Sequence, residues 1–414
     1  MMDKKFLLSF LFFIFALAKG DYVEDEMKLY DKILSEKNYN RNIRPVTNMS
    51  TSINVKMGVA LISILGVDEV QNSLTTQVWL RFLWQDYKLK WDPADYGAIT
   101  TIRLPIEKVW QPDITLYNTA DVGGQQYSDA LTVVYNSGDV LYIPSAIMKS
   151  TCVVDLTYFP YDTQTCTMKF GSWVYNGNQI TLDHYEGKEE IDLSDYIMSH
   201  EWEVTSTSAK HNVIFYPCCP EPYPDITYTL NLKRRGYLFA LVYVAPIAFL
   251  AILCPIIFLL PYSDHQRFAL GGCFLICLAI LLSSLERIYP LGHGTLPLLA
   301  KYYISVIVLL VLSLLFSAGI LNCADRASRP YPLPGVLKKV FVDGLGKVLC
   351  VSSESYDSFL NDEGQEENSN ERGKSDKRVR NNDWHAFATV LDRFFFICYV
   401  ILTVILSLVF LARV

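Results

Sequence analysis

Four apolar blocks constrain the fold of this chain more than any other feature of its sequence. The blocks carry few or no charges, and each is close to the ~20 residues that a helix needs to cross the core of a bilayer. They are residues 237–260, 268–285, 298–321 and 394–412. Buried helices of a large soluble domain are the alternative, but such helices normally keep a polar face. We therefore expect four membrane-spanning helices.

The N-terminus has the features of a secretory signal peptide. Residues 1–20 place Lys4 and Lys5 before an apolar run that ends in small residues, which is the arrangement of a cleaved leader. Residues 21–235 are then expected outside the cell, where cysteines can form disulfides. With four crossings, the sequence predicts a multi-pass protein of the plasma membrane.

The segment between the third and the fourth block is expected in the cytoplasm. Basic residues follow the third block, as is typical of cytoplasmic loops. The centre of this segment is highly charged and poor in aliphatic residues, which predicts disorder, and we expect a helix before the last block. The resulting division is a signal peptide at 1–20, an outer domain at 21–235, three spans at 236–321, a cytoplasmic loop at 322–393 and a last span at 394–412.

The outer domain has the pattern of a β-sandwich. Between residues 51 and 232, short segments alternate apolar and polar side chains and are separated by Gly, Pro, Asn and Asp. This period of two, with many β-branched and aromatic residues, predicts two packed antiparallel sheets. Residues 24–35 have helical spacing, so a short helix is expected before the strands.

Four of the ten cysteines lie in the outer domain. A bond between Cys152 and Cys166 would close a short loop and stabilise the fold by ~3 kcal/mol in the chain-entropy model. We expect the adjacent Cys218 and Cys219 to bond to each other in the oxidising compartment, although such a bridge is strained because neighbouring Cα atoms lie only ~3.8 Å apart. A half-site for a metal is the rival interpretation, although no histidine or third thiol is near in sequence. Asn48 begins the one glycosylation acceptor, Asn48-Met49-Ser50.

These features together resemble one known family, the Cys-loop pentameric ligand-gated ion channels. The resemblance covers nearly the whole chain: signal peptide, strand-rich outer domain, a Cys-bracketed loop that contains FPYD, four spans and a long charged loop before the last span. Within the family, the motifs VWQPDITLYN, KFGSWVY and YPCCPEPYPD are similar to those of nicotinic acetylcholine receptor subunits. The adjacent cysteines correspond to the α type of subunit.

The resemblance implies a ligand site between two subunits. One subunit would contribute Tyr117, Trp173, Tyr216, Cys218, Cys219 and Tyr223. Its neighbour would contribute Trp79, with Val133, Leu141 and Ile143 as an apolar wall. A quaternary ammonium such as acetylcholine donates no strong hydrogen bond, so aromatic ring faces are suited to hold it. Because one chain carries both sets, we expect a homopentamer, with a heteropentamer as the alternative.

The second block has a stripe that could line a pore. Steps of three and four residues place one set of side chains on the same face of a helix. The set is Gln266, Ala269, Cys273, Ile276, Ile280, Ser283 and Arg287. In a pentamer, rings of Ile276 and Ile280 would form a constriction that closes by dewetting. A lipid-facing helix with a chance stripe is the alternative.

The pore sequence departs from its relatives. By the resemblance, cation-selective members have glutamate where this chain has Gln266, and hydroxyl residues at Ala269 and Cys273. Anion-selective members insert proline and alanine just before the basic residue, and this chain lacks that insertion. We therefore expect a cation-selective pore. The alternative is a ligand-binding subunit that assembles but conducts poorly or not at all, or that responds to a ligand other than acetylcholine.

The resemblance also implies residues that couple the outer domain to the pore. These are Glu69, Phe159, Pro160 and Arg234. Glu69 is expected to form an ion pair with Arg234, and two solvated charges are the alternative, since exposed pairs contribute little.

Other classes of function find no support in the sequence. The outer histidines His184, His200 and His211 are scattered, with no nucleophile, metal-ligand spacing or Gly-rich phosphate loop beside them. We therefore expect no enzyme activity, no cofactor and no metal. The net charge of -7 gives no indication of nucleic-acid binding.

Overall fold

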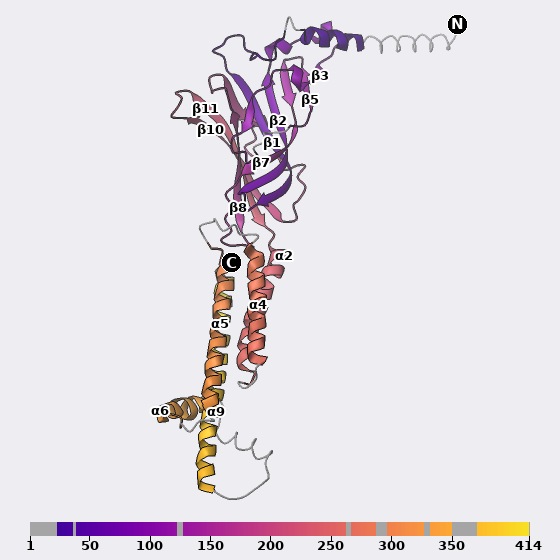
Figure 1. Cartoon of the computed structure of the whole chain (residues 1–414). Helices are drawn as coiled ribbons and strands as arrows, with labels where there is room; N and C mark the ends of the chain where they lie inside the picture. The colour runs from indigo at the N-terminus through magenta and orange to yellow at the C-terminus, as the bar shows by residue number, and fades with distance from the viewer. Residues whose placement is uncertain are drawn as a thin grey trace, which may run out of the picture. The chain divides into compact units, whose positions relative to one another are not determined.

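The structure is a computed structural model and describes residues 23–35, 39–121, 127–261, 266–286, 296–326, 332–349 and 371–413, with side chains of the last range from residue 383. The chain forms two compact units (Figure 1). The first comprises Met1–Asp155 and Thr163–Arg235, and the second comprises Leu156–Asp162 and Gly236–Val414. Arg287 and the signal peptide lie outside the described residues.

The first unit is a sandwich of two sheets preceded by a helix over residues 23–33. The strands of the seven-stranded sheet are β1 (Ile53–Asp68), β2 (Ser73–Gln85), β3 (Thr101–Pro105), β5 (Leu131–Tyr135), β6 (Asp139–Tyr142), β7 (Ser145–Thr151) and β9 (Ile180–His184). Those of the four-stranded sheet are β4 (Ile114–Leu116), β8 (Thr163–Ser172), β10 (Trp202–Phe215) and β11 (Pro222–Arg234). The larger sheet runs β3-β5-β6-β2-β1-β9, with β7 also paired to β2, and the smaller runs β10-β11-β8-β4.

The two sheets pack through the apolar faces that the alternating sequence creates. Trp84, Met57 and Phe170 are among the fully buried side chains of this core. Tyr228 on β11 is also buried, and its hydroxyl donates a hydrogen bond to the Met57 carbonyl on β1 at 3.0 Å. The expected sandwich is confirmed, and this bond joins its two sheets.

One strand pair differs from the antiparallel expectation. β9 pairs with β1 in parallel, with Ile53 opposite Ile180, whereas the other described ladders are antiparallel. A parallel pair needs a long connection, and here more than a hundred residues separate the two strands. Local alternation does not reveal the direction of such a distant partner.

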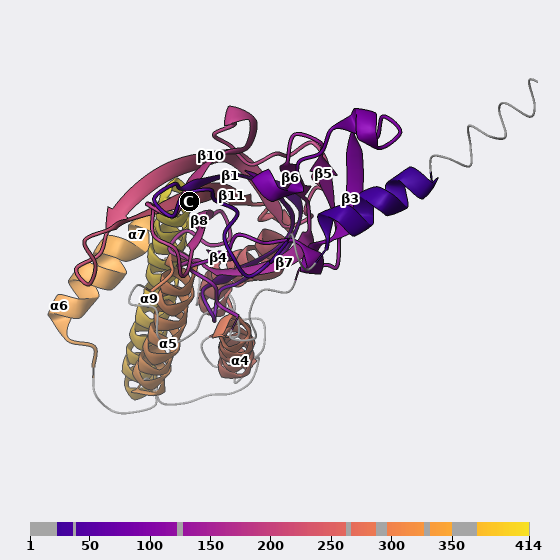
Figure 2. The same cartoon turned by 90° about the horizontal axis from the view of Figure 1, so that it is seen from above.

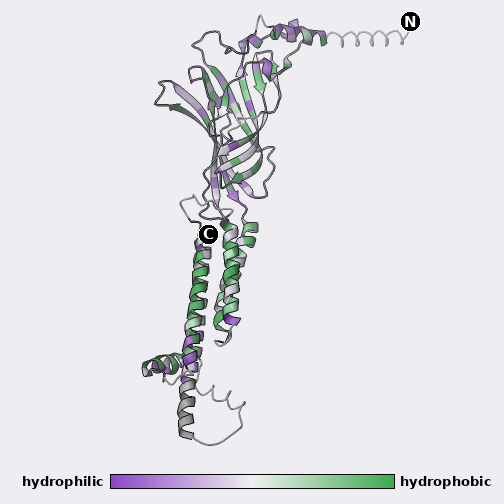
Figure 3. Cartoon of the chain, in the orientation of Figure 1, coloured by the Kyte–Doolittle hydropathy of each residue, from purple (hydrophilic) through white to green (hydrophobic). Residues whose placement is uncertain are grey.

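The second unit contains four helices long and apolar enough to cross a membrane: Tyr237–Phe258, Gln266–Glu286, Leu298–Asp325 and Asp383–Arg413. They are mostly green in the hydropathy view, unlike the mixed strands (Figure 3). The first consists of α2 (Tyr237–Phe239), η5 (Ala240–Val244), α3 (Ala245–Leu253) and η6 (Cys254–Phe258). Pro246 and Pro255 lack the amide donor of a regular helix, which accounts for the irregular segments beside them.

The other three spanning helices are α4 (Gln266–Glu286), α5 (Leu298–Asp325) and α9 (Glu371–Arg413). α9 begins before the expected last block, so part of the expected cytoplasmic loop is helical. Another part forms α6 (Gly335–Leu337), η8 (Lys338–Leu345) and α7 (Gly346–Val348). The ring of Phe341 in η8 packs edge-on against Phe387 of α9, with centroids 5.4 Å apart.

Residues 156–162 belong to the second unit although strands of the first flank them. The Phe159 ring is fully buried, with its centroid 5.4 Å from that of Phe239 and 6.4 Å from that of Tyr243. The Thr157 carbonyl accepts a hydrogen bond from the Leu298 amide at 3.0 Å. This loop therefore packs at the starts of the first and the third spanning helices.

Candidate functional site

The hairpin of β10 and β11 carries the adjacent cysteines at its tip. The Tyr216 carbonyl accepts a hydrogen bond from the Cys219 amide at 3.0 Å, which closes a turn with Pro217 in the second position, where proline is favoured. Cys218 is exposed and Cys219 half-buried. Their bridge stays a prediction, whereas Cys152 and Cys166 are bonded with an S–S distance of 2.00 Å.

Four aromatic side chains gather beside this hairpin, and we name them the aromatic group: Tyr117, Trp173, Tyr216 and Tyr223. Tyr117 and Trp173 follow β4 and β8, and their ring centroids lie 6.0 Å apart in an edge-to-face arrangement. Tyr216 and Tyr223 face each other across the hairpin at 5.6 Å. Trp173 is 71% exposed, too open for a packing residue of the sandwich core.

Tyr117 is fixed by its neighbours on β8. Its hydroxyl donates a hydrogen bond to the Ser172 carbonyl. A Cβ at Gly171 would lie 2.5 Å from Cζ and Oη of Tyr117, so only glycine leaves room for the ring. Burial, and then the neighbouring hydroxyl of Tyr216, raises the pKa of Tyr117. The hydroxyl therefore stays neutral and able to donate.

Asp113 holds the turn that presents Trp173. Its carboxylate accepts hydrogen bonds from the Ser172 hydroxyl at 2.5 Å and from the Val174 amide at 2.7 Å. The two bonds come from both sides of Trp173. They fix the backbone of an otherwise exposed residue, as a preformed binding surface requires.

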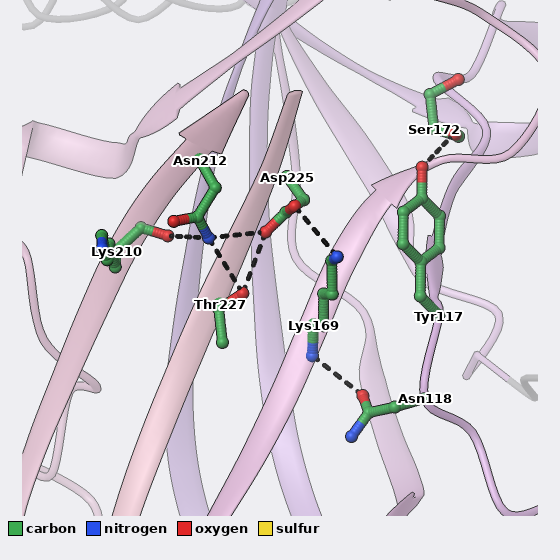
Figure 4. Close-up of polar contacts among 8 residues, drawn as sticks. All are labelled: Tyr117, Asn118, Lys169, Ser172, Lys210, Asn212, Asp225 and Thr227. Atoms are coloured by element: carbon green, nitrogen blue, oxygen red, sulfur yellow. Dashed lines mark hydrogen bonds and ion pairs between the residues drawn. The ribbon is translucent and has the colours of Figure 1, made fainter. Parts of the chain in front are cut away.

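A polar network surrounds the buried Asp225 on the sheet that also leads to Tyr117 (Figure 4). Asp225 on β11 is 1% exposed and accepts hydrogen bonds from Asn212 and Thr227, each at 2.9 Å. Its second oxygen lies 3.2 Å from Nζ of Lys169 on β8, and that Nζ is 5.8 Å from the centroid of the Tyr117 ring. The network joins three adjacent strands, and sequence reasoning missed it.

The apolar wall lies on the other sheet. Trp79 is on the outward face of β2, Val133 on β5 stands opposite Leu141 on β6, and Ile143 follows β6. Trp79 and Ile143 are exposed, and the other two are half-buried. β5 lies on the opposite side of the first unit from β10 in both cartoon views (Figures 1 and 2), and β6 pairs with β5. One chain therefore does not bring the wall to its own aromatic group.

Arg81 adds a charge to the sheet that bears the wall, two residues after Trp79. Its guanidinium lies 2.7 Å from a carboxylate oxygen of Asp192. Hydrogen bonds from Ser194, and then the charge of Arg81, lower the pKa of Asp192 to about 2. Sequence reasoning missed Arg81, although its outward position two residues from Trp79 follows from strand alternation.

Arg234 is buried between two carboxylates. Its Nη2 lies 2.9 Å from Glu69, its Nη1 bonds to Glu201, and its guanidinium lies 4.2 Å from the centroid of the Trp202 ring. The expected pair of Glu69 and Arg234 is confirmed, and the alternative of two solvated charges is wrong because the Arg234 side chain is only 1% exposed. Glu201 and Trp202 were not expected here.

The stripe of α4 is exposed wherever the structure describes it. Its described members are Gln266, Ala269, Cys273, Ile276, Ile280 and Ser283, and all are exposed. The buried residues of α4 are Arg267, Gly271, Leu278 and Leu285. A helix turns by about 100° per residue, so these two sets lie on opposite faces. The described part of the stripe is therefore exposed on the face of α4 opposite its buried residues, and its place along a pore stays a prediction.

Two further expectations concern glycosylation of Asn48 and metal binding by the adjacent cysteines. Asn48 is exposed, and its Oδ1 accepts a hydrogen bond from the Ser50 amide at 3.2 Å. Its glycosylation stays a prediction. Within the described ranges, no three His, Cys, Asp or Glu side chains are grouped to hold a metal ion, so the adjacent cysteines have no described third ligand.

Comparison with known proteins places the chain among its relatives. Residues 26–236 match the neurotransmitter-gated ion-channel ligand binding domain. Acetylcholine receptor subunit alpha-L1 of Schistocerca gregaria is 39% identical over 342 residues, covering 79% of this chain and 60% of that protein. Acetylcholine receptor subunit beta-like 1 of Drosophila melanogaster is 35% identical over 339 residues, covering 82% and 65%.

The chain covers a larger share of a mammalian relative than of the two insect proteins. Neuronal acetylcholine receptor subunit alpha-9 of Rattus norvegicus is 36% identical over 334 residues, covering 81% of this chain and 68% of that protein. The chain spans less than two thirds of the two insect relatives. Both the domain match and these identities agree with the sandwich and the four apolar helices, and the chain therefore belongs to the family of neurotransmitter-gated ion channels, among the nicotinic acetylcholine receptor subunits.

Proposed function

We propose that this chain is an α-type subunit of a pentameric channel that opens when a small cation such as acetylcholine binds between subunits. The family consists of ion channels and not of enzymes. The observation that carries the proposal is the aromatic group, with Trp173 exposed at the edge of a fixed turn. Cysteines 218 and 219 would stiffen the hairpin tip that closes over the ligand.

The aromatic group suits a quaternary ammonium. Each ring face attracts a cation by about 0.5 to 2 kcal/mol, and such a ligand needs no strong hydrogen-bond acceptor. The carboxylates of Asp113 and Asp225 are already occupied by hydrogen bonds and by Lys169. The rings, rather than a free carboxylate, are thus the surface offered to the ligand.

The site needs two subunits. The apolar wall lies on the side of the unit opposite the hairpin, so the wall of one copy would face the aromatic group of the next. A homopentamer can complete every site because each chain carries both sets, and a heteropentamer would replace some of them.

The stripe of α4 would line a cation-selective path. Ile276 and Ile280 are large, exposed and apolar, and rings of them would close the path by dewetting. The absence of the Pro-Ala insertion before the basic residue Arg267 supports selectivity for cations over anions. The Glu69, Arg234, Phe159 and Pro160 positions would transmit ligand binding to this gate.

A second candidate is a subunit that binds ligand and assembles without conducting. It is favoured by Gln266, Ala269 and Cys273, because these three positions of the exposed stripe carry neither a carboxylate nor a hydroxyl. Ligand-evoked current from the chain expressed alone decides between the two. Reversal potentials that follow sodium support the cation path, whereas potentials that follow chloride contradict it.

The ligand site is tested by Trp173→Ala and Tyr216→Ala. We expect either change to abolish binding of a labelled cholinergic ligand while pentamer assembly persists, because neither side chain is in the sandwich core. Binding is measured on purified full-length protein, with elution volume as the check on assembly. Unchanged affinity in both variants would remove the aromatic group from the site.

A further inference from the structure

Between Arg267 and Ser283, α4 carries side-chain heteroatoms at two positions only, Cys273 and Cys277. All other residues of this stretch are glycine, alanine or larger apolar residues. Both cysteines are exposed and unbonded. The middle of the helix therefore offers sulfur but no oxygen or nitrogen side-chain ligand.

The rotation of α4 is fixed by its buried face. Arg267 forms an ion pair with Asp392 of α9, and its Nε donates a hydrogen bond to the Ile257 carbonyl at 2.7 Å. A Cβ at Gly271 would lie 2.4 Å from Leu314 of α5, so the two helices meet closely there. Neither cysteine can turn toward the bundle without breaking these contacts.

The two thiols are neighbours on the exposed side. Residues four apart on a helix have Cβ atoms about 5–6 Å apart, and they differ by about 40° around the axis. Cys273 belongs to the stripe, and Cys277 flanks it. Two sulfurs on adjacent turns can thus reach one ion together.

We propose that Cys273 and Cys277 form a binding site for soft, thiophilic metal cations such as Cd²⁺, completed in the assembled channel by the same pair from neighbouring copies. Thiolates select soft cations, whereas Ca²⁺ and Mg²⁺ prefer oxygen ligands. Each thiol that binds the metal releases its proton to water as the metal–sulfur bond forms, and no group is oxidised or reduced. One consequence rests on the proposed function: a cation held by these cysteines blocks the path of the ions through the channel.

The binding test uses cadmium on purified full-length protein. We expect Cd²⁺ to protect Cys273 and Cys277 from N-ethylmaleimide, measured by peptide mass spectrometry. Cys273→Ser should weaken protection of Cys277 at least about tenfold, because losing a direct ligand should cost no less affinity than the roughly 10–100-fold that changes around metal ligands cost. Cys398 is a half-buried free thiol on α9. Cys398→Ser is therefore the matched control and should leave the protection of Cys273 and Cys277 unchanged. The amount of cadmium retained per chain provides a second readout. The double variant, which combines Cys273→Ser and Cys277→Ser, should retain less cadmium than the unsubstituted chain.

A current test separates this site from the proposed function. Micromolar Cd²⁺ should block ligand-evoked current of the unsubstituted chain and of Cys398→Ser, but not of the double variant. Normal current without block, together with equal cadmium retention in the double variant, would overturn the metal site alone. Specific cadmium binding without any ligand-evoked current would count against the proposed channel and leave the metal site standing.

Discussion

Gly171 shows how one missing methyl group positions a ligand-site ring. A Cβ there would lie 2.5 Å from the Tyr117 ring, so Gly171→Ala must displace Tyr117 and break its bond to Ser172. We expect the affinity for a labelled cholinergic ligand to fall about tenfold or more, since losing a buried hydrogen bond costs about 1–3 kcal/mol. Gly66→Ala is the matched control, because a Cβ at Gly66 meets nothing within 4 Å. Equal affinities in the two variants would mean that Tyr117 is not held in place by Gly171.

Asp192 gives the outer domain a measurable response to acid. Its pKa in the folded state, about 2, is below the ~3.9 of an unfolded chain. The stabilisation is therefore complete above about pH 5 and is lost as the pH falls toward 2. Ser194→Ala removes the hydroxyl that donates to Asp192 at 2.6 Å.

The variant should be less stable above pH 5 and should lose less stability on acidification. Denaturant unfolding between pH 5 and pH 2, followed by tryptophan fluorescence, measures both quantities. Identical pH slopes for the two proteins would show that Ser194 does not hold the carboxylate in its charged form.

The end of β11 forms an electrostatic unit with the neighbouring segments. Arg234 is shared by Glu69 and Glu201 and is stacked on Trp202. Removing one member of a buried pair typically costs 3–5 kcal/mol, so we expect Arg234→Glu or Glu69→Arg alone to suppress ligand-evoked current. Reversing both charges should restore the current, because the two positions attract each other again. The restoration should be only partial, since Arg234→Glu also places a carboxylate beside that of Glu201. Simple additivity of the two changes in a double-mutant cycle would contradict the coupling role of this pair.

Some elements of this fold could be predicted from sequence and others could not. Apolar length locates the four spanning helices, and the helical stripe of α4 follows from its period, because both depend only on nearby residues. The network around Asp225 depends on Lys169 and Asn212, which strand pairing brings together from distant positions. The parallel partner of β1 is likewise a long-range outcome. Aromatic site residues were found through family motifs, since any one of them alone resembles a packing residue.

For the molecule as an assembly, we expect the chain to form homopentamers without a partner subunit. Each copy carries both an aromatic group and an apolar wall on opposite sides of its outer domain. Stepwise photobleaching of a fluorescent fusion on the cell surface should give five steps when the chain is expressed alone. Surface delivery only on coexpression with another subunit would contradict this expectation.

The loop of residues 156–162 has a practical consequence for anyone who wishes to study the outer domain by itself. Truncation after Arg235 removes Phe239 and Tyr243 but keeps Phe159, whose ring they cover. The shortened protein would expose the Phe159 ring, which is fully buried in the whole chain, and would tend to aggregate. A soluble fragment therefore requires a hydrophilic replacement of this loop as well as a new C-terminus.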